Sequence, residues 1–490
     1  MTSDIGTTAM RGLLWSAAQN WGGRLITFAM FAILARLLTP ADYGVASAAL
    51  VVVAFVTMVS EFGFGDAIIQ RRDLKPEDVD LPFVVSVATS FLLSGVIVAF
   101  AGAFEVWLKA PGLTPILIGL GALAPIMTLS VFQEINYKRV FAFRTLAFRV
   151  LIANVVGGVA AVAAAGLGAG VWSLVLQSYV TALVGLIWLW WSPMWRPQWR
   201  FTVESLRPLG RFALPVITMR IVDFVSSRVV ELIIIRQFGI AAFGVYSVGA
   251  RLYQILLILL QSVLNDVSLP VLSTVADDRE RLGRIYLQSV NFSTFLATPI
   301  FVLFAALSPE ICDVLFGAKW AGVDAISLPL LLVGAVQCVQ HLNGPYMTAR
   351  GRPGKTLVLG LIKYMIIIVG LLAVSFDRID HLVAYYAVLQ LAVTPLSFAV
   401  AAHELGLSYL KVARILFVGG IGCAIAFFGV VVARPFVSPI LPHGILSGIA
   451  LGLVYSACLL AFYVMFARRQ LGEIIRFVTT RIGKGKPNAA

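Results

Sequence analysis

The sequence predicts an all-α polytopic membrane protein with about fourteen transmembrane helices. Three observations support this fold class: apolar residues make up 60% of the 490-residue chain, charged residues make up only 12%, and the mean hydropathy is +0.94. A soluble globular protein carries about 25% charged residues. A chain this long and this apolar is expected to fold in lipid, where spanning helices satisfy their own backbone hydrogen bonds.

Long apolar runs separated by turn residues define the individual helices, because a helix needs about 20 apolar residues to cross the hydrocarbon. Turn-forming pairs such as Thr39-Pro40 and Pro111-Gly112 separate several of these runs. The expected spans are residues 12–36, 41–69, 81–107, 112–134, 148–167, 170–191, 210–236, 241–270, 286–307, 324–348, 356–376, 381–403, 412–433 and 444–467.

The distribution of Lys and Arg predicts the orientation. With the N-terminus placed in the cytoplasm, 26 of the 37 basic residues fall in cytoplasmic segments and 6 in outer segments. This asymmetry obeys the positive-inside rule, so both termini are expected to be cytoplasmic. The net charge of +13 is therefore explained without nucleic acid, and the basic loops are expected to contact anionic membrane lipids. The remaining five basic residues, which lie away from the ends of the expected spans, are Arg24, Arg220, Arg228, Arg251 and Lys363.

Two stretches that lie 200 residues apart indicate an internal repeat. Residues 34–47 read LARLLTPADYGVAS and residues 234–247 read IIRQFGIAAFGVYS, so Arg36, Gly44 and Ser47 recur at the same offset. Repeated helical pairs in a membrane chain are typical of two-lobed transporters, in which the substrate path runs between the repeats. The alternative is chance similarity between two apolar hairpins.

The repeat predicts a domain organisation of two pseudo-symmetric six-helix lobes around a central cavity, followed by two extra C-terminal helices. The tail places apolar residues at helical spacing with basic residues between them, which predicts an amphipathic helix on the inner leaflet. The expected segments are an N-terminal lobe at 1–191, an interfacial linker at 192–209, a C-terminal lobe at 210–403, helices 13 and 14 at 404–467, and the basic cytoplasmic tail at 468–490.

Polar and charged residues inside the spans are the candidate functional residues. An ionised side chain at the bilayer centre costs about 2.5–3.5 kcal/mol on insertion scales, so it persists by facing a cavity or a partner. The substrate-binding candidates are Arg24, Arg251, Arg220, Arg228, Gln19, Asn20 and Trp21, the last three as glycan contacts. The candidates for a coupling or counter-ion role are Asp223, Glu61 and Glu231. Asp66, near a helix end, is expected to be a structural counter-ion.

The seventh expected span carries a charged stripe. Arg220 and Asp223 are three residues apart, as are Arg228 and Glu231, and residues at this spacing are neighbours on a helix. One interpretation is that the arginines line an aqueous cavity and bind an anionic substrate. The alternative is that each pair forms a salt bridge within the helix and only aids packing.

The opening segment RGLLWSAAQNWGGRLITFAMFAILARLLTPADYGV, followed by EFGFGDAIIQRRD, resembles Wzx-type polysaccharide flippases. Their superfamily includes the multidrug (MATE) exporters and the lipid II flippase. The resemblance implies alternating access and an undecaprenyl-diphosphate-linked oligosaccharide as cargo, moved across the bacterial inner membrane for exopolysaccharide, capsule or O-antigen synthesis. It also implies that Arg24 and Arg251 are cavity arginines for the diphosphate, and neither has an acid three or four residues away.

Other functional classes fit the sequence less well. A MATE-like multidrug antiporter usually holds its cargo with cavity acids, whereas these spans are rich in arginine; that antiporter and a lipid II flippase are the alternatives. No nucleophile–base constellation, ATPase motif or metal-ligand spacing is present, so we expect no enzymatic activity, cofactor or metal. Coupling is then expected to come from an ion gradient, the membrane potential or product consumption. A polysaccharide polymerase or glycosyltransferases are the expected protein partners.

Overall fold

The computed structural model describes residues 23, 26–70, 75–140, 142–199, 203–275, 278–350, 353–441, 444–468 and 472. Every regular element within these ranges is helical. Eleven of the described helices are long and apolar enough to cross a membrane, or twelve if one bent pair is a single span. The chain is therefore a multi-pass membrane protein of the expected fold class, and the count of fourteen spans stays a prediction.

The described helices form two compact units. We call the unit within Trp15–Ser247 the N-unit and the unit from Val248 onwards the C-unit. Helix α11 (Ile240–Val275) begins in the N-unit and continues in the C-unit. The lobe boundaries inferred from the sequence stay a prediction, and the amphipathic tail lies almost wholly outside the described residues.

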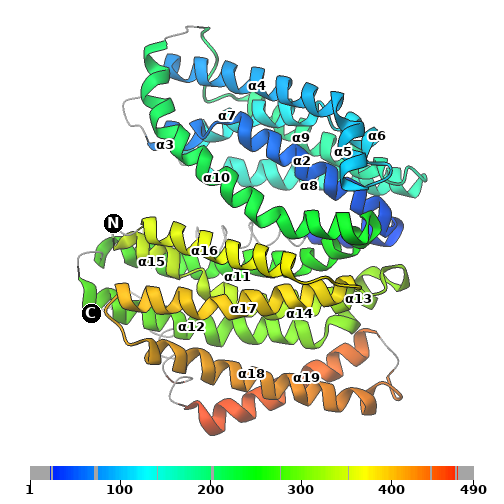
Figure 1. Cartoon of the computed structure of the whole chain (residues 1–490), viewed down its shortest axis with the longest axis vertical. Coiled ribbons are helices and arrows are strands. Elements are labelled where there is room, and N and C mark those ends of the chain that lie inside the picture. Colours follow the sequence, from blue (N-terminus) through cyan, green and yellow to red (C-terminus); the bar gives the residue numbers. More distant parts are fainter. Residues whose placement is uncertain are drawn as a thin grey trace, which may run out of the picture. The chain divides into compact units, whose positions relative to one another are not determined.

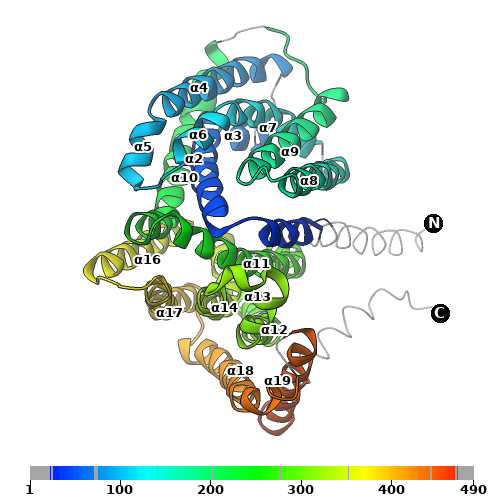
Figure 2. The same cartoon turned by 90° about the vertical axis from the view of Figure 1, so that its right-hand side faces the viewer.

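The N-unit is a bundle in which α8 and α9 run side by side (Figure 2). Its elements are a short helix at Ile26–Leu37, α2 (Pro40–Ser60), α3 (Phe64–Gln70), η1 (Pro76–Val79), α4 (Asp80–Ala99), α5 (Ala101–Leu108), α6 (Leu113–Gly119), α7 (Leu123–Arg139), α8 (Phe143–Gly166), α9 (Trp172–Trp191) and α10 (Val203–Phe238). The fourth expected span is the bent pair α6 and α7, whose axes differ by 42°.

The C-unit is a second bundle, in which α12 and α14 lie side by side (Figure 1). Besides most of α11, its elements are α12 (Arg279–Ala306), α13 (Ser308–Phe316), η2 (Ala318–Trp320), α14 (Val323–Gln340), α15 (Asn343–Ala349), α16 (Pro353–Ala373), α17 (Ile379–Glu404), α18 (Tyr409–Val437) and α19 (Ile445–Phe466). Helices α18 and α19 correspond to the expected spans at 412–433 and 444–467.

The start of α2 shows how the sequence fixes a helix end. Thr39 lies at the N-cap and Pro40 in the first turn, where its missing N–H is not needed. The Thr39 hydroxyl oxygen accepts from the Asp42 N–H at 3.3 Å, and the Asp42 carboxylate accepts from the Thr39 N–H at 3.0 Å. This reciprocal capping box satisfies two backbone donors that a helix leaves unpaired. The Thr-Pro-Ala-Asp segment therefore sets where α2 begins.

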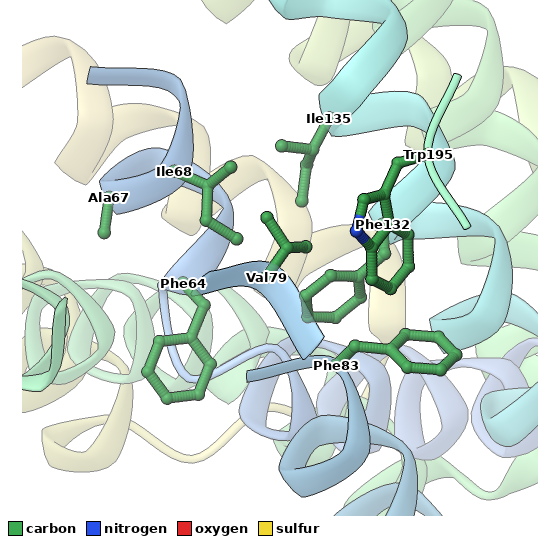
Figure 3. Close-up of a cluster of buried hydrophobic side chains, with 8 residues drawn as sticks. All are labelled: Phe64, Ala67, Ile68, Val79, Phe83, Phe132, Ile135 and Trp195. Carbon is green, nitrogen blue, oxygen red and sulfur yellow. The ribbon is translucent and has the colours of Figure 1, made fainter. Parts of the chain in front are cut away.

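The expected linker begins as a segment packed on the N-unit. Trp195 is buried in a cluster with Phe83 and Phe132, and its ring meets that of Phe83 edge to face, with 5.3 Å between the ring centroids (Figure 3). The Gln133 side chain donates to the Trp195 carbonyl at 2.7 Å. Because α10 begins at Val203, the second half of the expected linker forms the first part of α10.

An ion pair and a hydrogen bond connect α18 and α19 to the other helices of the C-unit. Arg434 on α18 donates to both carboxylate oxygens of Glu310 on α13, each at 3.0 Å, and to the Ala306 carbonyl at 2.6 Å. Glu310 is only 2% exposed. On α19, the Tyr455 hydroxyl donates to the Pro299 carbonyl at 2.9 Å. Such paired charges are tolerated inside a membrane protein because each satisfies the other.

Candidate functional site

The two halves of the sequence repeat contact each other at the turns that begin α2 and α11. An ideal Cβ on Gly44 would lie 2.0 Å from the Ile240 carbonyl oxygen, and one on Gly244 would lie 1.8 Å from the Pro40 carbonyl oxygen. Pro40 and Ile240 are themselves 200 residues apart. The contact is therefore reciprocal, as across a two-fold axis, and only glycine permits this backbone approach.

A hydrogen bond extends the same pseudo-symmetric contact by one turn. The Ser47 hydroxyl donates to the Ser247 hydroxyl at 3.3 Å, and Ser247 donates to the Gly244 carbonyl at 2.9 Å. Small residues at a helix contact let backbones approach closely in membranes. The repeat inferred from the sequence thus corresponds to a physical pairing of its two copies.

A cluster of three charges lies between α10 and the α2–α3 turn. Arg220 Nη1 lies 3.2 Å from Glu61 Oε2, and Arg220 Nη2 lies 2.6 Å from Asp66 Oδ2. We call these three residues the Arg220 cluster. Arg220 and Asp66 are partly exposed, whereas the Glu61 side chain is 17% exposed. One guanidinium faces two carboxylates, so the cluster as a whole carries one negative charge when both are ionised.

The α2–α3 turn is shaped to bring the two carboxylates together. Phe62 and Gly63 adopt positive φ angles of 50° and 71°, and this conformation is uncommon for a bulky residue such as Phe. A Cβ on Gly65 would lie 2.2 Å from Glu61 Oε1, so a larger residue there would displace the Glu61 carboxylate from this position. Phe64 is held in the buried cluster of Figure 3. Backbone strain of this kind is typical of functional sites.

Arg228 lies two turns further along α10 and pairs within its own helix. It forms an ion pair with Glu231 at 2.5 Å, and its guanidinium lies 5.5 Å from the centre of the Phe224 ring. The three-residue spacing of Arg228 and Glu231 in the sequence predicts this pair. The same spacing had suggested Asp223 as the partner of Arg220, whereas the ion pairs that the structure shows for Arg220 run to Glu61 and Asp66.

Most of the remaining candidate residues lie outside the part of the chain that the structure describes. Gln19, Asn20, Trp21 and Arg24 lie outside the described residues. Arg251 lies on α11 with an exposed side chain, so the expected diphosphate site at Arg24 and Arg251 stays a prediction. Asp66, which the sequence analysis predicts to be a structural counter-ion, pairs with Arg220 in the Arg220 cluster. Over the part of the chain that the structure describes, no group of three or more potential metal ligands is present.

Membrane-spanning helices in two compact units, with a pseudo-symmetric contact between the repeats, define a helical membrane protein of the repeat-built class, an architecture that is typical of transporters. Within that class, the chain belongs to the polysaccharide biosynthesis protein family, whose model matches residues 33–325, more than half of the sequence.

Solved structures of known proteins share this fold. The fold resembles that of the lipid II flippase MurJ in an inward closed conformation, with a TM-score of 0.71 at 12% identity over 94% of this chain and 100% of that one. It also resembles a multidrug resistance MATE family transporter of the MOP superfamily in an inward-facing conformation, with a TM-score of 0.61 at 17% identity over 78% and 94% of the two chains. At these identities the likeness concerns the fold.

Curated relatives come from several polysaccharide systems. The succinoglycan biosynthesis transport protein ExoT of Rhizobium meliloti is 29% identical over 64% of this chain and 64% of its own length. The teichuronic acid biosynthesis protein TuaB of Bacillus subtilis is 22% identical over 70% and 71% of the two chains. The lipopolysaccharide biosynthesis protein WzxC of Escherichia coli is 22% identical over 70% of each chain. The match thus spans just under two thirds of the Rhizobium protein.

Proposed function

We propose that this protein is a flippase that moves a lipid-linked oligosaccharide across the bacterial inner membrane for the synthesis of a surface polysaccharide. The observation that carries the proposal is the family match over residues 33–325 on a fold that a lipid II flippase shares. The names of the relatives, which concern succinoglycan, teichuronic acid and lipopolysaccharide, point to the same class of cargo.

The chemistry of such a cargo suits the charged residues. The lipid tail can stay in the bilayer, but the headgroup must cross about 30 Å of hydrocarbon. We propose undecaprenyl diphosphate as the carrier, because arginine binds phosphate oxygens in a bidentate manner. Arg24 and Arg251 are the proposed contacts to the diphosphate, and Gln19, Asn20 and Trp21 the proposed contacts to the glycan.

The contacts of the Arg220 cluster favour a role in opening and closing the transport path over a role as a permanent phosphate site. Its guanidinium already bonds to Glu61 and Asp66, so a phosphate would have to displace both carboxylates. We propose that this cluster closes one side of the transport path and opens during the cycle. Arg228 and Glu231 are proposed to stay paired as a packing element.

Several further features belong to the same proposal. Both termini are proposed to be cytoplasmic, on the basis of the Lys and Arg asymmetry. Translocation needs no bond to be made or broken, so the protein is proposed not to act as an enzyme. A polymerase or glycosyltransferases of the same polysaccharide system are its proposed partners.

Removing the gene from the bacterium that carries it tests the proposal. We expect surface polysaccharide to be lost and its lipid-linked repeat unit to accumulate with the glycan on the cytoplasmic face. The wild-type gene should restore output, Arg251→Ala should not, and the control Arg284→Ala should, because Arg284 lies in an exposed ion pair with Glu280. Normal polysaccharide output without the gene would contradict the proposal.

A further inference from the structure

Lys363 lies at the centre of a membrane-spanning helix. Helix α16 runs from Pro353 to Ala373, so ten residues separate Lys363 from each end. At a rise of 1.5 Å per residue, each end is ~15 Å away. A lysine near a helix end can extend its four-carbon stem to the headgroups. Lys363 is too far from both ends for this, so its ammonium group stays at mid-membrane depth.

The side chain of Lys363 faces the protein rather than lipid. It shares one face of α16 with Ile367 and Leu371, which are 3% and 1% exposed. The opposite face carries Met365 and Val369, which are 60% and 58% exposed. An apolar exposed face on a spanning helix is the face that lipid covers. Lys363, which is half-buried, therefore lies on the side of α16 that carries its buried residues.

The neighbouring helix does not neutralise this charge. Helix α17 packs against α16, with Gly370 in contact with Leu389. The acids of α17 lie at its two ends, and each is already paired: Asp380 with Arg378, and Glu404 with Lys355. The short helix α15 also packs against α16, and it has no charged residue.

Lys363 itself takes part in no hydrogen bond or ion pair among the residues that the structure describes. The N-unit shows the opposite pattern, because Arg149, Arg220 and Arg228 each lie beside a carboxylate. A protein-facing cation without a counter-charge is costly in a membrane and marks a functional position.

The backbone one turn before Lys363 has no neighbouring side chain against it. Gly360 precedes Lys363 by three residues on the same face of α16, and an ideal Cβ there would meet no atom within 4 Å. Gly334 and Gly370 differ, because a Cβ on either would lie within 3 Å of a neighbouring side chain. The surface of α16 beside Lys363 is therefore uncovered at Gly360.

We propose that Lys363 binds an anionic group of the translocated headgroup, either a phosphate of the lipid carrier or a carboxylate of an acidic sugar. This inference rests on the proposed function and extends it to a residue in the C-unit. The binding anion supplies the counter-charge that α15 and α17 do not provide. The uncompensated charge thus makes the site selective for acidic cargo.

Thermal unfolding of the purified full chain in detergent tests the site. Inorganic diphosphate and sodium glucuronate are the two probes, one for each source of the anion. We expect at least one to raise the unfolding temperature of the wild type, Lys363→Met to abolish that rise, and Lys363→Arg to keep most of it. Lys411→Met is the matched control, since it removes an exposed lysine at the start of α18, and it should keep the full rise.

The same melting curves without ligand separate a binding role from a structural one. Removing an uncompensated charge should leave the unliganded protein as stable as the wild type or more stable. A lower unfolding temperature for unliganded Lys363→Met would contradict the inference, since it would make Lys363 a structural residue. An unchanged ligand response in Lys363→Met, or no response of the wild type to either probe, would also contradict it.

A flipping assay with the protein in proteoliposomes distinguishes failure of the anion site at Lys363 from failure of the proposed flippase function. If the wild type moves no lipid-linked glycan while the Lys363-dependent ligand response persists, the proposed function fails and the anion site stands. If the wild type moves the glycan and Lys363→Met does so at the same rate with the same ligand response, the site fails and the function stands. We expect Lys363→Met to slow the flipping of acidic cargo at least tenfold.

Discussion

Gly44 and Gly244 approach each other so closely that a β-carbon on either would collide with the backbone of the other's helix, at 2.0 Å and 1.8 Å. They are equivalent positions of a 200-residue repeat, so each copy supplies the same glycine to the same contact. Ser47 and Ser247 continue this symmetry. The flippase that we propose would alternate between states and would need contacts that form in one state and break in another. The contact between Gly44 and Gly244 is tight and symmetric, as such a contact requires.

Replacing either glycine by alanine should disturb this contact. The new methyl group meets backbone rather than a movable side chain, so Gly44→Ala or Gly244→Ala should cost about 1–3 kcal/mol of stability in this conformation. Gly95→Ala is the matched control, because a Cβ there meets nothing within 4 Å, and it should be neutral or slightly stabilising. Thermal unfolding in detergent measures the difference. Equal stability of the Gly44 and Gly95 variants would contradict the observed packing.

A reversible cross-link should show whether the contact opens during transport. In a background without the four native cysteines, Ser47→Cys together with Ser247→Cys should oxidise readily, since the two hydroxyl oxygens lie 3.3 Å apart. Oxidation should stop glycan flipping and a reductant should restore it. Each single cysteine variant is the control and should be insensitive to oxidant. Full flipping by the cross-linked protein would mean that this contact stays closed throughout the cycle.

The sequence predicted the helices and the local charge pair but not the long-range contacts. Apolar length located spans such as α8 and α9, and three-residue spacing predicted Arg228 with Glu231. The partners of Arg220 are 159 and 154 positions away, and helical spacing carries no information about such pairs. The repeat indicated two equivalent glycines, but sequence similarity alone does not say that the two copies pack on each other.

Removing the cation of the Arg220 cluster should destabilise the described conformation. Arg220→Ala leaves Glu61 and Asp66 facing each other without their shared guanidinium. The pair is half-buried, so we expect a loss of about 1–3 kcal/mol, between the values for exposed and buried ion pairs. Adding Glu61→Gln should recover part of the loss by removing the repulsion. The exposed pair variant Arg284→Ala should lose at most ~0.5 kcal/mol; an equal loss in both variants would show that the cluster has no special role.

The ion pair between Arg434 and Glu310 should be the stronger structural link. Arg434→Met leaves Glu310, which is 2% exposed, as an uncompensated buried charge, so we expect a loss of about 3–5 kcal/mol. The double variant Arg434→Met with Glu310→Met removes both charges and should recover most of that stability. Thermal unfolding measures all three proteins. A double variant no more stable than Arg434→Met alone would show that the loss comes from packing rather than charge.

A flipping assay in proteoliposomes measures whether this protein carries a lipid-linked oligosaccharide across a bilayer, as we propose. Undecaprenyl-diphosphate-linked oligosaccharide is placed in the inner leaflet, and its glycan is detected with a sugar-cleaving enzyme added outside. We expect wild-type protein to expose the glycan far faster than protein-free liposomes do, and oxidised Ser47→Cys/Ser247→Cys protein to expose it no faster than they do. Exposure at the protein-free rate by correctly folded wild-type protein would show that the protein is not a flippase for this cargo.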